Sequence, residues 1–176
     1  MFPRTHHPAP DFALPDLQGK FHALTQYRGQ IVILNFWSAE CPWSERTDQG
    51  LSAALQEWAA IPEAHAPVVL LLIASNAHET PEQLAQTAGE RGFPFVLHDP
   101  NRRVADLYKA QTTPHLFVID SNSILRYQGA FDDVTFRQRI PTKHYLKDAV
   151  DALLRGDTPD PCETPAYGCA IVSFAE

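Results

Sequence analysis

The residue type best suited to chemistry in this chain is cysteine, which occurs at Cys41, Cys162 and Cys169. Cys41 follows an apolar run that ends at Trp37, and it precedes Pro42, after which apolar residues recur at helical spacing. A proline is tolerated in the first turn of a helix because its missing N–H would have no partner there. We therefore expect Cys41 at a helix start, where unpaired amides and the helix dipole favour a thiolate. Such a thiolate would be a nucleophile toward sulfur or peroxide oxygen.

Composition limits the classes of protein to which the chain can belong. Its 176 residues suit one domain, and 44% hydrophobic with 20% charged residues is ordinary for a globular protein. The longest apolar run, 66–74, is too short to cross a bilayer. The net charge of −7 disfavours binding to a phosphate backbone. We therefore expect neither nucleic acid nor a membrane as a partner.

The N-terminal segment and the cysteine count indicate the compartment. Residues 1–10 contain three prolines and lack the apolar core of a signal peptide. Three cysteines, an odd number, indicate reduced thiols or a catalytic set rather than a structural disulfide framework. The expected location is the cytoplasm.

The hydrophobic pattern and the turn residues predict a single domain over residues 1–176, with strands and helices that alternate. The lead-in 1–10 is expected to be extended and to precede a hairpin of 12–14 with 21–24. Strands are predicted over 31–37, 67–74, 93–97, 115–120 and 124–128. Helices are predicted over 42–60, from the N-cap Thr80 to about 89–92, from Asp99 past Tyr108, and over 143–154. The tail 157–176 is expected to lie extended across the body. This order predicts an α/β fold, a central mixed β-sheet with helices on both faces.

Two groups of motifs carry a family resemblance. The segment Asn35-Phe-Trp-Ser-Ala-Glu-Cys-Pro-Trp-Ser44 resembles the active-site segment of thioredoxin-fold thiol-disulfide oxidoreductases, and Thr113-Pro114 resembles the cis-proline of that fold. Segments 127–133 and 164–171 are similar to a narrower branch, the redoxin or peroxiredoxin-like thioredoxin proteins, which carry a late Gly-Cys-x-Ile. The resemblance spans most of the chain. It implies a thioredoxin-like fold and a cis peptide bond at Pro114 beside the thiol. Such a cis-proline would leave backbone groups free to pair with a bound peptide.

Several positions depart from the family pattern. Ser44 stands where a dithiol oxidoreductase has its second cysteine, so the thiol that resolves Cys41 must come from elsewhere. Asn35 replaces a buried aspartate. Glu40 replaces an aromatic residue and would raise the pKa of the thiol if it approached the sulfur. Against the peroxiredoxin pattern Pro-x-x-x-Thr-x-x-Cys, Ser38 supplies the hydroxyl, but leucine stands at the proline position.

The roles of the two late cysteines stay open at this point. Cys162 and Cys169 are interpreted as a disulfide that closes a small loop, as two inert thiols, or as resolving partners of Cys41. Cys169 is the stronger candidate because the family motif includes it.

The surroundings of the thiolate also have alternatives. Ser44 is either a hydrogen-bond partner of the sulfur or an ordinary helix residue. Trp37 is expected in the core, with Trp43 exposed as an apolar rim. His115 either stabilises the thiolate or points away from it. Residues 132–133 are interpreted as a solvated turn.

The leading functional hypothesis is a thiol-dependent oxidoreductase in which Cys41 attacks a disulfide, of a protein or a small molecule, or a peroxide. A second thiol (Cys169, Cys162 or an external one) would resolve the product, and an external thiol reductant would complete the cycle. The first alternative is a peroxiredoxin-like thiol peroxidase, with an antioxidant role in cell redox homeostasis. The second is a redox-inactive binding module. Neither a cofactor nor a metal is expected, because the eight histidines lack ligand spacing. The sequence leaves the substrate, the electron donor and the oligomeric state open.

Overall fold

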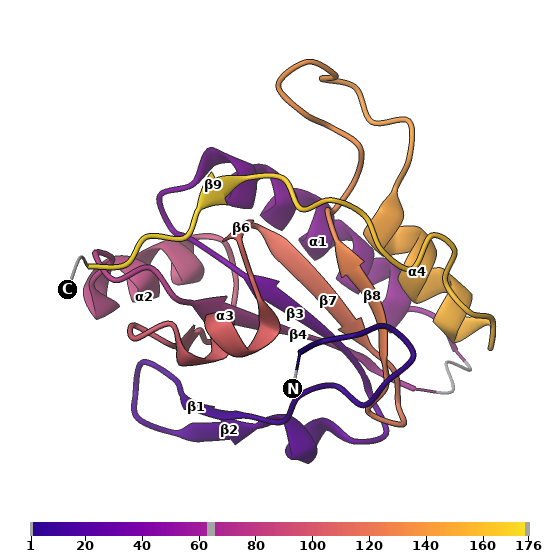
Figure 1. Cartoon of the computed structure of the whole chain (residues 1–176), viewed down its shortest axis with the longest axis horizontal. Helices are drawn as coiled ribbons and strands as arrows, with labels where there is room; N and C mark the ends of the chain where they lie inside the picture. Colours follow the sequence, from indigo (N-terminus) through magenta and orange to yellow (C-terminus); the bar gives the residue numbers. More distant parts are fainter. Residues whose placement is uncertain (1, 63–65, 175–176) are drawn as a thin grey trace.

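The computed structural model describes residues 2–62 and 66–174. The ends of the predicted lead-in and tail, Met1 and 175–176, and residues 63–65 after the first helix lie outside the described residues. A mixed sheet with the strand order β5-β4-β3-β7-β8 forms the centre of the molecule (Figure 1). Neighbouring strands are parallel for β3 with β4 and β4 with β5, and antiparallel for β3 with β7 and β7 with β8. The strands are β3 (Ile31–Phe36), β4 (Val68–Ala74), β5 (Leu97–His98), β7 (His115–Ile119) and β8 (Leu125–Gly129). The predicted mixed sheet is confirmed.

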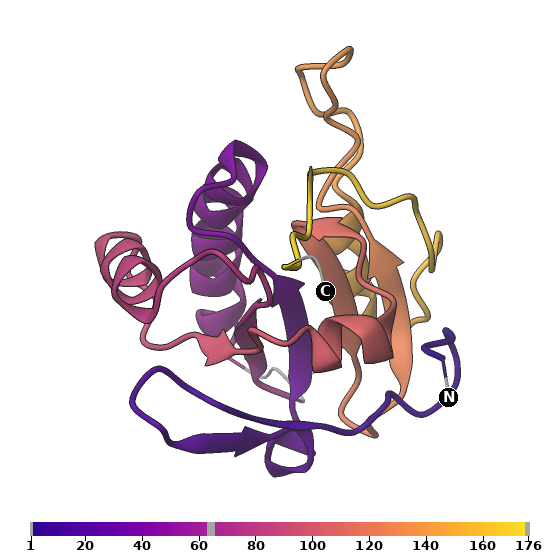
Figure 2. The same ribbon diagram turned by 60° about the vertical axis from the view of Figure 1, so that its left-hand side comes forward.

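Helices cover both faces of this sheet (Figure 2). Alternate residues of β3 point to opposite faces and are largely apolar on both, so each face needs such a cover. Ile33 packs in one cluster with Leu51 of α1 and Leu146 of α4. Leu34 packs in another cluster with Val104 of α3. The helices are α1 (Pro42–Ala59), α2 (Pro81–Glu90), α3 (Arg103–Tyr108) and α4 (Tyr145–Leu154).

The N-terminal hairpin is present as predicted, with β1 (Ala13–Pro15) paired to β2 (Phe21–Ala23). Its turn contains Gly19 at a φ of +86°, a conformation that favours glycine. The Asp16 carboxylate accepts hydrogen bonds from turn amides and from the His22 ring, at 2.9 Å, so it stabilises the turn. The Asp16 pKa is lowered, chiefly by the His22 hydrogen bond. A 3-10 helix, η1 (Leu24–Tyr27), then leads toward β3.

The sequence predicts a strand over 93–97, and this is wrong for most of its length. The Phe93 N–H bonds to the Ala88 carbonyl and so completes the C-terminus of α2, after Gly92 at a φ of +78°. The apolar residues of this segment pack onto α2 and the sheet face instead of pairing as a strand. Pairing with β4 is left to Leu97 and His98.

The predicted extended tail is confirmed, and it crosses the surface from α4 to the region of α1 and α2 (Figure 1). Its first part lies beside β8, where the Thr164 N–H donates to the Gln128 carbonyl and the Gln128 N–H to the Cys162 carbonyl. Its last part forms β9 (Cys169–Ala170), antiparallel to β6 (Thr112–Thr113). This second small sheet brings the tail to the start of α1.

Over residues 2–62 and 66–174, no helix combines the length and the apolar composition that a membrane span requires.

Candidate active site

Cys41 occupies the N-cap of α1, as the sequence predicts. The buried strand β3 ends at Phe36, a short loop follows, and Pro42 takes the first helical position. The Cys41 carbonyl accepts the Glu45 N–H at 3.0 Å, which is the first bond of the helix. The residue is only 3% exposed. Its sulfur therefore lies at the positive end of an 18-residue helix.

The loop before Pro114 faces this sulfur. The Thr113–Pro114 peptide bond is cis, and Thr113 and Pro114 are buried. The Cys41 Sγ lies 3.1 Å from the Thr113 carbonyl oxygen. A neutral thiol at this position donates a hydrogen bond to that oxygen, whereas a thiolate does not. The helix start and this carbonyl therefore act on the thiol in opposite directions.

Cys169 is the partner of Cys41 in the structure, where the two residues form a disulfide with a Cα–Cα distance of 6.2 Å. They are 128 residues apart in the chain. The pairing of β9 with β6 places Cys169 directly opposite Thr113. Of the three alternatives for the late cysteines, the structure shows the one in which Cys169 reaches Cys41.

Cys162 lies elsewhere and is a free cysteine. Its Sγ is 3.7 Å from the Thr5 hydroxyl of the N-terminal lead-in. The disulfide between Cys162 and Cys169 that the sequence left open is not formed. The structure therefore does not place Cys162 in the site around Cys41.

A buried carboxylate that sequence reasoning missed lies beside the Cys41 loop. Glu79, 3% exposed, accepts hydrogen bonds from the Ser38 hydroxyl at 2.9 Å and from the Glu40 N–H at 3.1 Å. Its second oxygen accepts from the Asn76 side chain at 3.0 Å. The only available signal was an acidic residue just after the carboxyl end of β4, where the loops of neighbouring parallel strands meet. Glu79 orients the backbone that leads into Cys41.

The polar residues next to the cysteine have partners other than its sulfur. The Ser44 hydroxyl accepts the Ser38 N–H at 3.3 Å and makes no hydrogen bond to the Cys41 sulfur among the described residues, so of the two alternatives the structure favours an ordinary helix residue. The Glu40 carboxylate pairs with His78 at 3.1 Å on the exposed side. Asn35 is fully buried, and both its amide atoms lack hydrogen-bond partners within the described residues.

Trp37 is fully buried and Trp43 is partly exposed, as expected. The Trp37 Nε1–H donates to Asp48 at 2.8 Å, and Arg91 pairs with the same carboxylate at 2.7 Å. Burial raises the pKa of Asp48, while the hydrogen bonds from Trp37 and Arg91 act against this rise. Because Arg91 also donates to the Ala39 carbonyl, at 3.2 Å, this cluster joins the end of α2 to the loop before Cys41.

The interpretation of residues 132–133 as a solvated turn is wrong for Asp132. Asp132 is 5% exposed and binds Arg46 of α1 through both oxygens, at 3.1 and 2.6 Å. Its carboxylate also accepts the Val134 N–H at 3.1 Å. A bidentate arginine compensates the burial of the charge. The pair therefore attaches the loop after β8 to the first turns of α1.

The His115 ring contacts groups other than the Cys41 sulfur. Its Nδ1 accepts the Gln111 N–H at 3.2 Å, and its ring stacks on Phe117 with the centroids 4.6 Å apart. Burial lowers the pKa of the imidazole to about 4, so the ring is neutral near pH 7 and supplies no positive charge. Of the two alternatives for His115, the structure favours the one in which the ring points away from Cys41.

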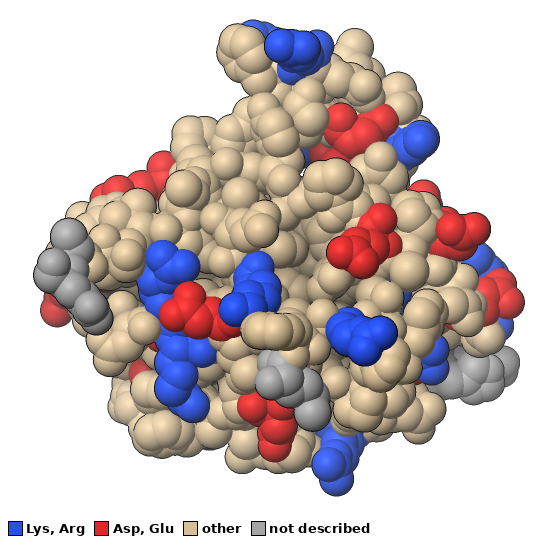
Figure 3. Space-filling view, in the orientation of Figure 1, with Lys and Arg blue, Asp and Glu red and all other residues tan. Residues whose placement is uncertain are grey.

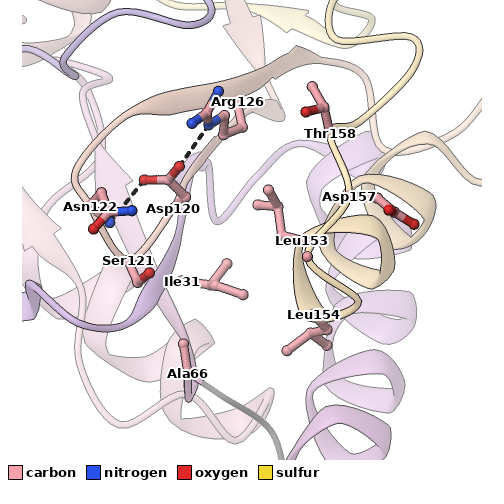
Figure 4. A pocket seen from close by; sticks show the side chains of 11 residues that line it. Ile31, Ala66, Asp120, Ser121, Asn122, Arg126, Leu153, Leu154, Asp157 and Thr158 are labelled. Atoms are coloured by element: carbon pink, nitrogen blue, oxygen red, sulfur yellow. Dashed lines mark hydrogen bonds and ion pairs between the residues drawn. The ribbon is translucent and has the colours of Figure 1, made fainter.

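The structure also contains a cavity of about 250 Å³, whose lining side chains are drawn in Figure 4. It is lined by Ile31 at the start of β3, by the turn between β7 and β8, and by the end of α4, so it lies at the opposite end of the sheet from Cys41. Its Asp120 carboxylate is already paired with Arg126, at 2.6 Å. No chemistry connects this cavity with the cysteines.

Comparisons with known proteins agree with this geometry. A model of the AhpC/TSA family matches residues 5–128. The thiol-disulfide oxidoreductase ResA of Geobacillus thermodenitrificans is 34% identical over 114 residues, which are 65% of this chain and 62% of ResA, so this chain spans less than two thirds of that relative's length. The solved structure of the hypothetical protein SMc02350 of Sinorhizobium meliloti aligns with a TM-score of 0.85 at 28% identity, over 98% of this chain and 96% of that one. The lipoprotein thioredoxin Etrx1 of Streptococcus pneumoniae, 22% identical, aligns over 84% of this chain and 99% of its own with a TM-score of 0.56, a likeness in fold.

Proposed function

The chain belongs to the AhpC/TSA family and has a thioredoxin-like fold, and we propose that it is a thiol-disulfide oxidoreductase in which Cys41 is the nucleophile and Cys169 the resolving thiol. The observation that carries this proposal is the Cys41–Cys169 disulfide at the N-terminus of α1. The similarity to ResA, a thiol-disulfide oxidoreductase, supports it.

The proposed cycle consists of two exchanges and a reduction. The Cys41 thiolate attacks one sulfur of a substrate disulfide, forms a mixed disulfide and releases the other substrate sulfur as a thiolate. The Cys169 thiolate then attacks the Cys41 Sγ, and the second substrate sulfur leaves as a thiolate. The substrate has gained two electrons and the enzyme has lost them. An external thiol reductant returns Cys41 and Cys169 to thiols.

The first expected outcome is that the Cys41 thiol has a pKa below the ordinary cysteine value of about 8.5, because the helix start stabilises the thiolate. The Glu40 carboxylate, which would oppose this, is paired with His78 instead. The measurement is the rate of Cys41 alkylation against pH in the reduced chain, followed on the Cys41 peptide by mass spectrometry. Disulfide mapping of the same sample after oxidation supplies the second readout.

A titration midpoint at or above about 8.5, with no disulfide from Cys41 in the oxidised sample, would contradict the proposal. It would favour the alternative in which the chain is a redox-inactive binding module.

The cytoplasmic location expected from the sequence stays a prediction, which fractionation of cells producing the full-length protein tests.

The second expected outcome is slow reduction of hydrogen peroxide. The hydroxyl at the peroxiredoxin threonine position, that of Ser38, donates to Glu79 rather than pointing to the sulfur. Leu34 stands at the proline position and is fully buried in the core. We expect a small disulfide such as glutathione disulfide to be reduced readily, and peroxide to react slowly. Stopped-flow measurement of both reactions in the same preparation checks this, and rapid peroxide turnover through Cys41 would establish the peroxidase alternative.

A further inference from the structure

The tail occupies the backbone edge that a bound peptide would use. Thr113 immediately precedes the cis peptide bond beside Cys41, and its edge is taken by β9, in the register Thr112 with Ala170 and Thr113 with Cys169. An extended segment that adds to an exposed edge in this way is a recognised mode of peptide binding. The tail segment 167–171, Tyr-Gly-Cys-Ala-Ile, lies along the edge to which such a peptide would add.

The residue before the cysteine must be small at this edge. A Cβ added at Gly168 would overlap the Thr113 carbonyl oxygen, which is backbone and cannot turn away. The same Cβ would also lie 3.0 Å from the Pro114 ring. Only glycine brings the chain this close to the cis peptide bond.

The residue two positions before the cysteine, Tyr167, is held by contacts of its own. It lines one narrow cleft together with Trp43, Pro114 and Val134. Its ring meets the Trp43 ring edge to face, with the centroids 4.9 Å apart. Its hydroxyl accepts the Phe136 N–H at 2.7 Å. These two contacts of Tyr167 suit an aromatic side chain with a polar tip.

The segment is held after the cysteine as well. The Ile171 side chain is 8% exposed and belongs to the core cluster of α3. The Val172 N–H donates to the Asn76 side chain at 2.7 Å, and the Ala77 N–H donates to the Val172 carbonyl at 3.0 Å. Contacts on both sides of Cys169 thus define a groove with a direction and a register.

Charge plays little part in this groove. The segment 167–171 has no charged residue. Figure 3 shows mostly uncharged atoms where β9 and the adjoining tail lie in Figure 1, with acidic and basic side chains interspersed below this region. A ligand of this groove is recognised by shape and backbone pairing rather than by net charge.

From this geometry we propose that segment 167–171 is an internal substrate mimic, and that the external substrate is an extended, uncharged protein segment with glycine directly before its disulfide cysteine and an aromatic residue two positions before it. This rests on the proposed function, since it names the substrate class of the same cysteine. The groove formed by Trp43, Thr113, Pro114 and Val134 selects that segment.

Because the tail and the substrate segment use the same groove, resolution of the mixed disulfide is coupled to product release. In the mixed disulfide, the substrate segment pairs with β6, and the tail is displaced from this edge. When the Cys169 thiolate attacks the Cys41 Sγ, the Cys41–Cys169 bond forms and the bond to the substrate sulfur breaks, so this sulfur leaves as a thiolate. The tail then takes over the edge at Thr113 and expels the product.

The experiment uses the reduced full-length Cys169→Ser chain, in which the mixed disulfide of Cys41 accumulates. The probe is the capped peptide Tyr-Gly-Cys-Ala-Ile with glutathione attached to its cysteine, compared with Ala-Gly-Cys-Ala-Ile and Tyr-Ala-Cys-Ala-Ile in the same form. We expect Cys41 to bond to the peptide and to react about fivefold faster with the first peptide than with the second. The alanine of the third peptide overlaps Thr113, so we expect a rate at least about tenfold lower.

Two further variants separate the groove from general reactivity. Gly168→Ala added to Cys169→Ser excludes the tail from the groove, so we expect Cys41 to react faster with the first peptide. Gly168→Ala alone is expected to slow the formation of the Cys41–Cys169 disulfide. Trp43→Ala should remove the preference for the aromatic peptide. Phe21→Ala, which truncates an exposed aromatic residue of β2, should keep it.

The outcomes distinguish the two proposals. Equal rates for the three peptides and for glutathione disulfide would overturn the substrate mimic and leave the oxidoreductase intact. Slower peptide reaction after Gly168→Ala would likewise overturn it. Failure of Cys41 to react with any of these disulfides would overturn the proposed function, and the inference with it.

Discussion

The Cys41→Ser variant is expected to lose disulfide reduction by a factor on the order of 10³ or more, because a serine hydroxyl at this position cannot replace a thiolate as the nucleophile. Cys169→Ser is expected to keep the first exchange and to stop at the mixed disulfide, so that multiple turnover slows while a single turnover does not. Cys162→Ser is expected to behave as the wild type, since the Cys162 sulfur lies beside Thr5, away from the disulfide. Single-turnover and steady-state rates with one disulfide substrate distinguish the three variants.

Peptide mapping of the oxidised variants supplies the structural readout for the same series. Wild type and Cys162→Ser should yield a Cys41–Cys169 peptide after oxidation at low protein concentration. The contradicting result is a Cys162–Cys169 peptide as the only intramolecular crosslink, with Cys41 free or joined to glutathione. In that case resolution is external, and the chain works as a monothiol enzyme.

The second large effect is a loss of stability on mild acidification that depends on His115. Burial lowers the pKa of this imidazole in the folded chain to about 4, whereas the unfolded chain has the ordinary histidine pKa of about 6.5. The unfolded state therefore binds the proton first as the pH falls. The stability that the neutral His115 ring contributes is fully present above about pH 6.5 and is lost as the pH falls from about 6.5 to 4. Below about pH 4 this residue causes no further change in stability.

For this one residue we expect a loss of about 2 kcal/mol in the free energy of unfolding between pH 7.5 and 5, a range that avoids most carboxylate titration. His115→Asn should remove most of this loss. The measurement is urea unfolding at several pH values, with His144→Asn as the matched control because His144 is exposed. A His115→Asn variant with the pH dependence of the wild type would show that the ring does not titrate as its burial implies.

Some predictions succeed because their signals are local. Pro42 directly after Cys41 indicates a helix start, and Thr80 caps α2 through the Gln83 N–H as its position before Pro81 predicts. The strands β3 and β4 follow from apolar runs, which Asn35 of β3 alone interrupts, because a strand covered on both faces is largely apolar.

Other predictions fail where a local pattern fits two environments. The run 93–97 is apolar and typical of a strand, yet the Phe93 N–H bonds to the Ala88 carbonyl of α2, and only Leu97 of this run pairs with β4. Asp132 lies in a polar stretch typical of a solvated turn, but Arg46, 86 residues away, makes its burial possible. In both cases the local pattern fits two environments, and contacts with residues outside the segment decide the outcome.

The sequence by itself determined the nucleophile candidate, the order of the elements and the absence of a local second cysteine, since these depend on residue types and on spacings of a few residues. Only the tertiary structure decided that Cys169 rather than Cys162 meets Cys41, that Glu79 holds the loop before the cysteine, and that the tail fills the edge beside Pro114. Contacts between residues 39 to 128 positions apart leave no periodicity in the chain. They arise when packing against one sheet brings distant segments to the same edge, and so they are properties of the fold.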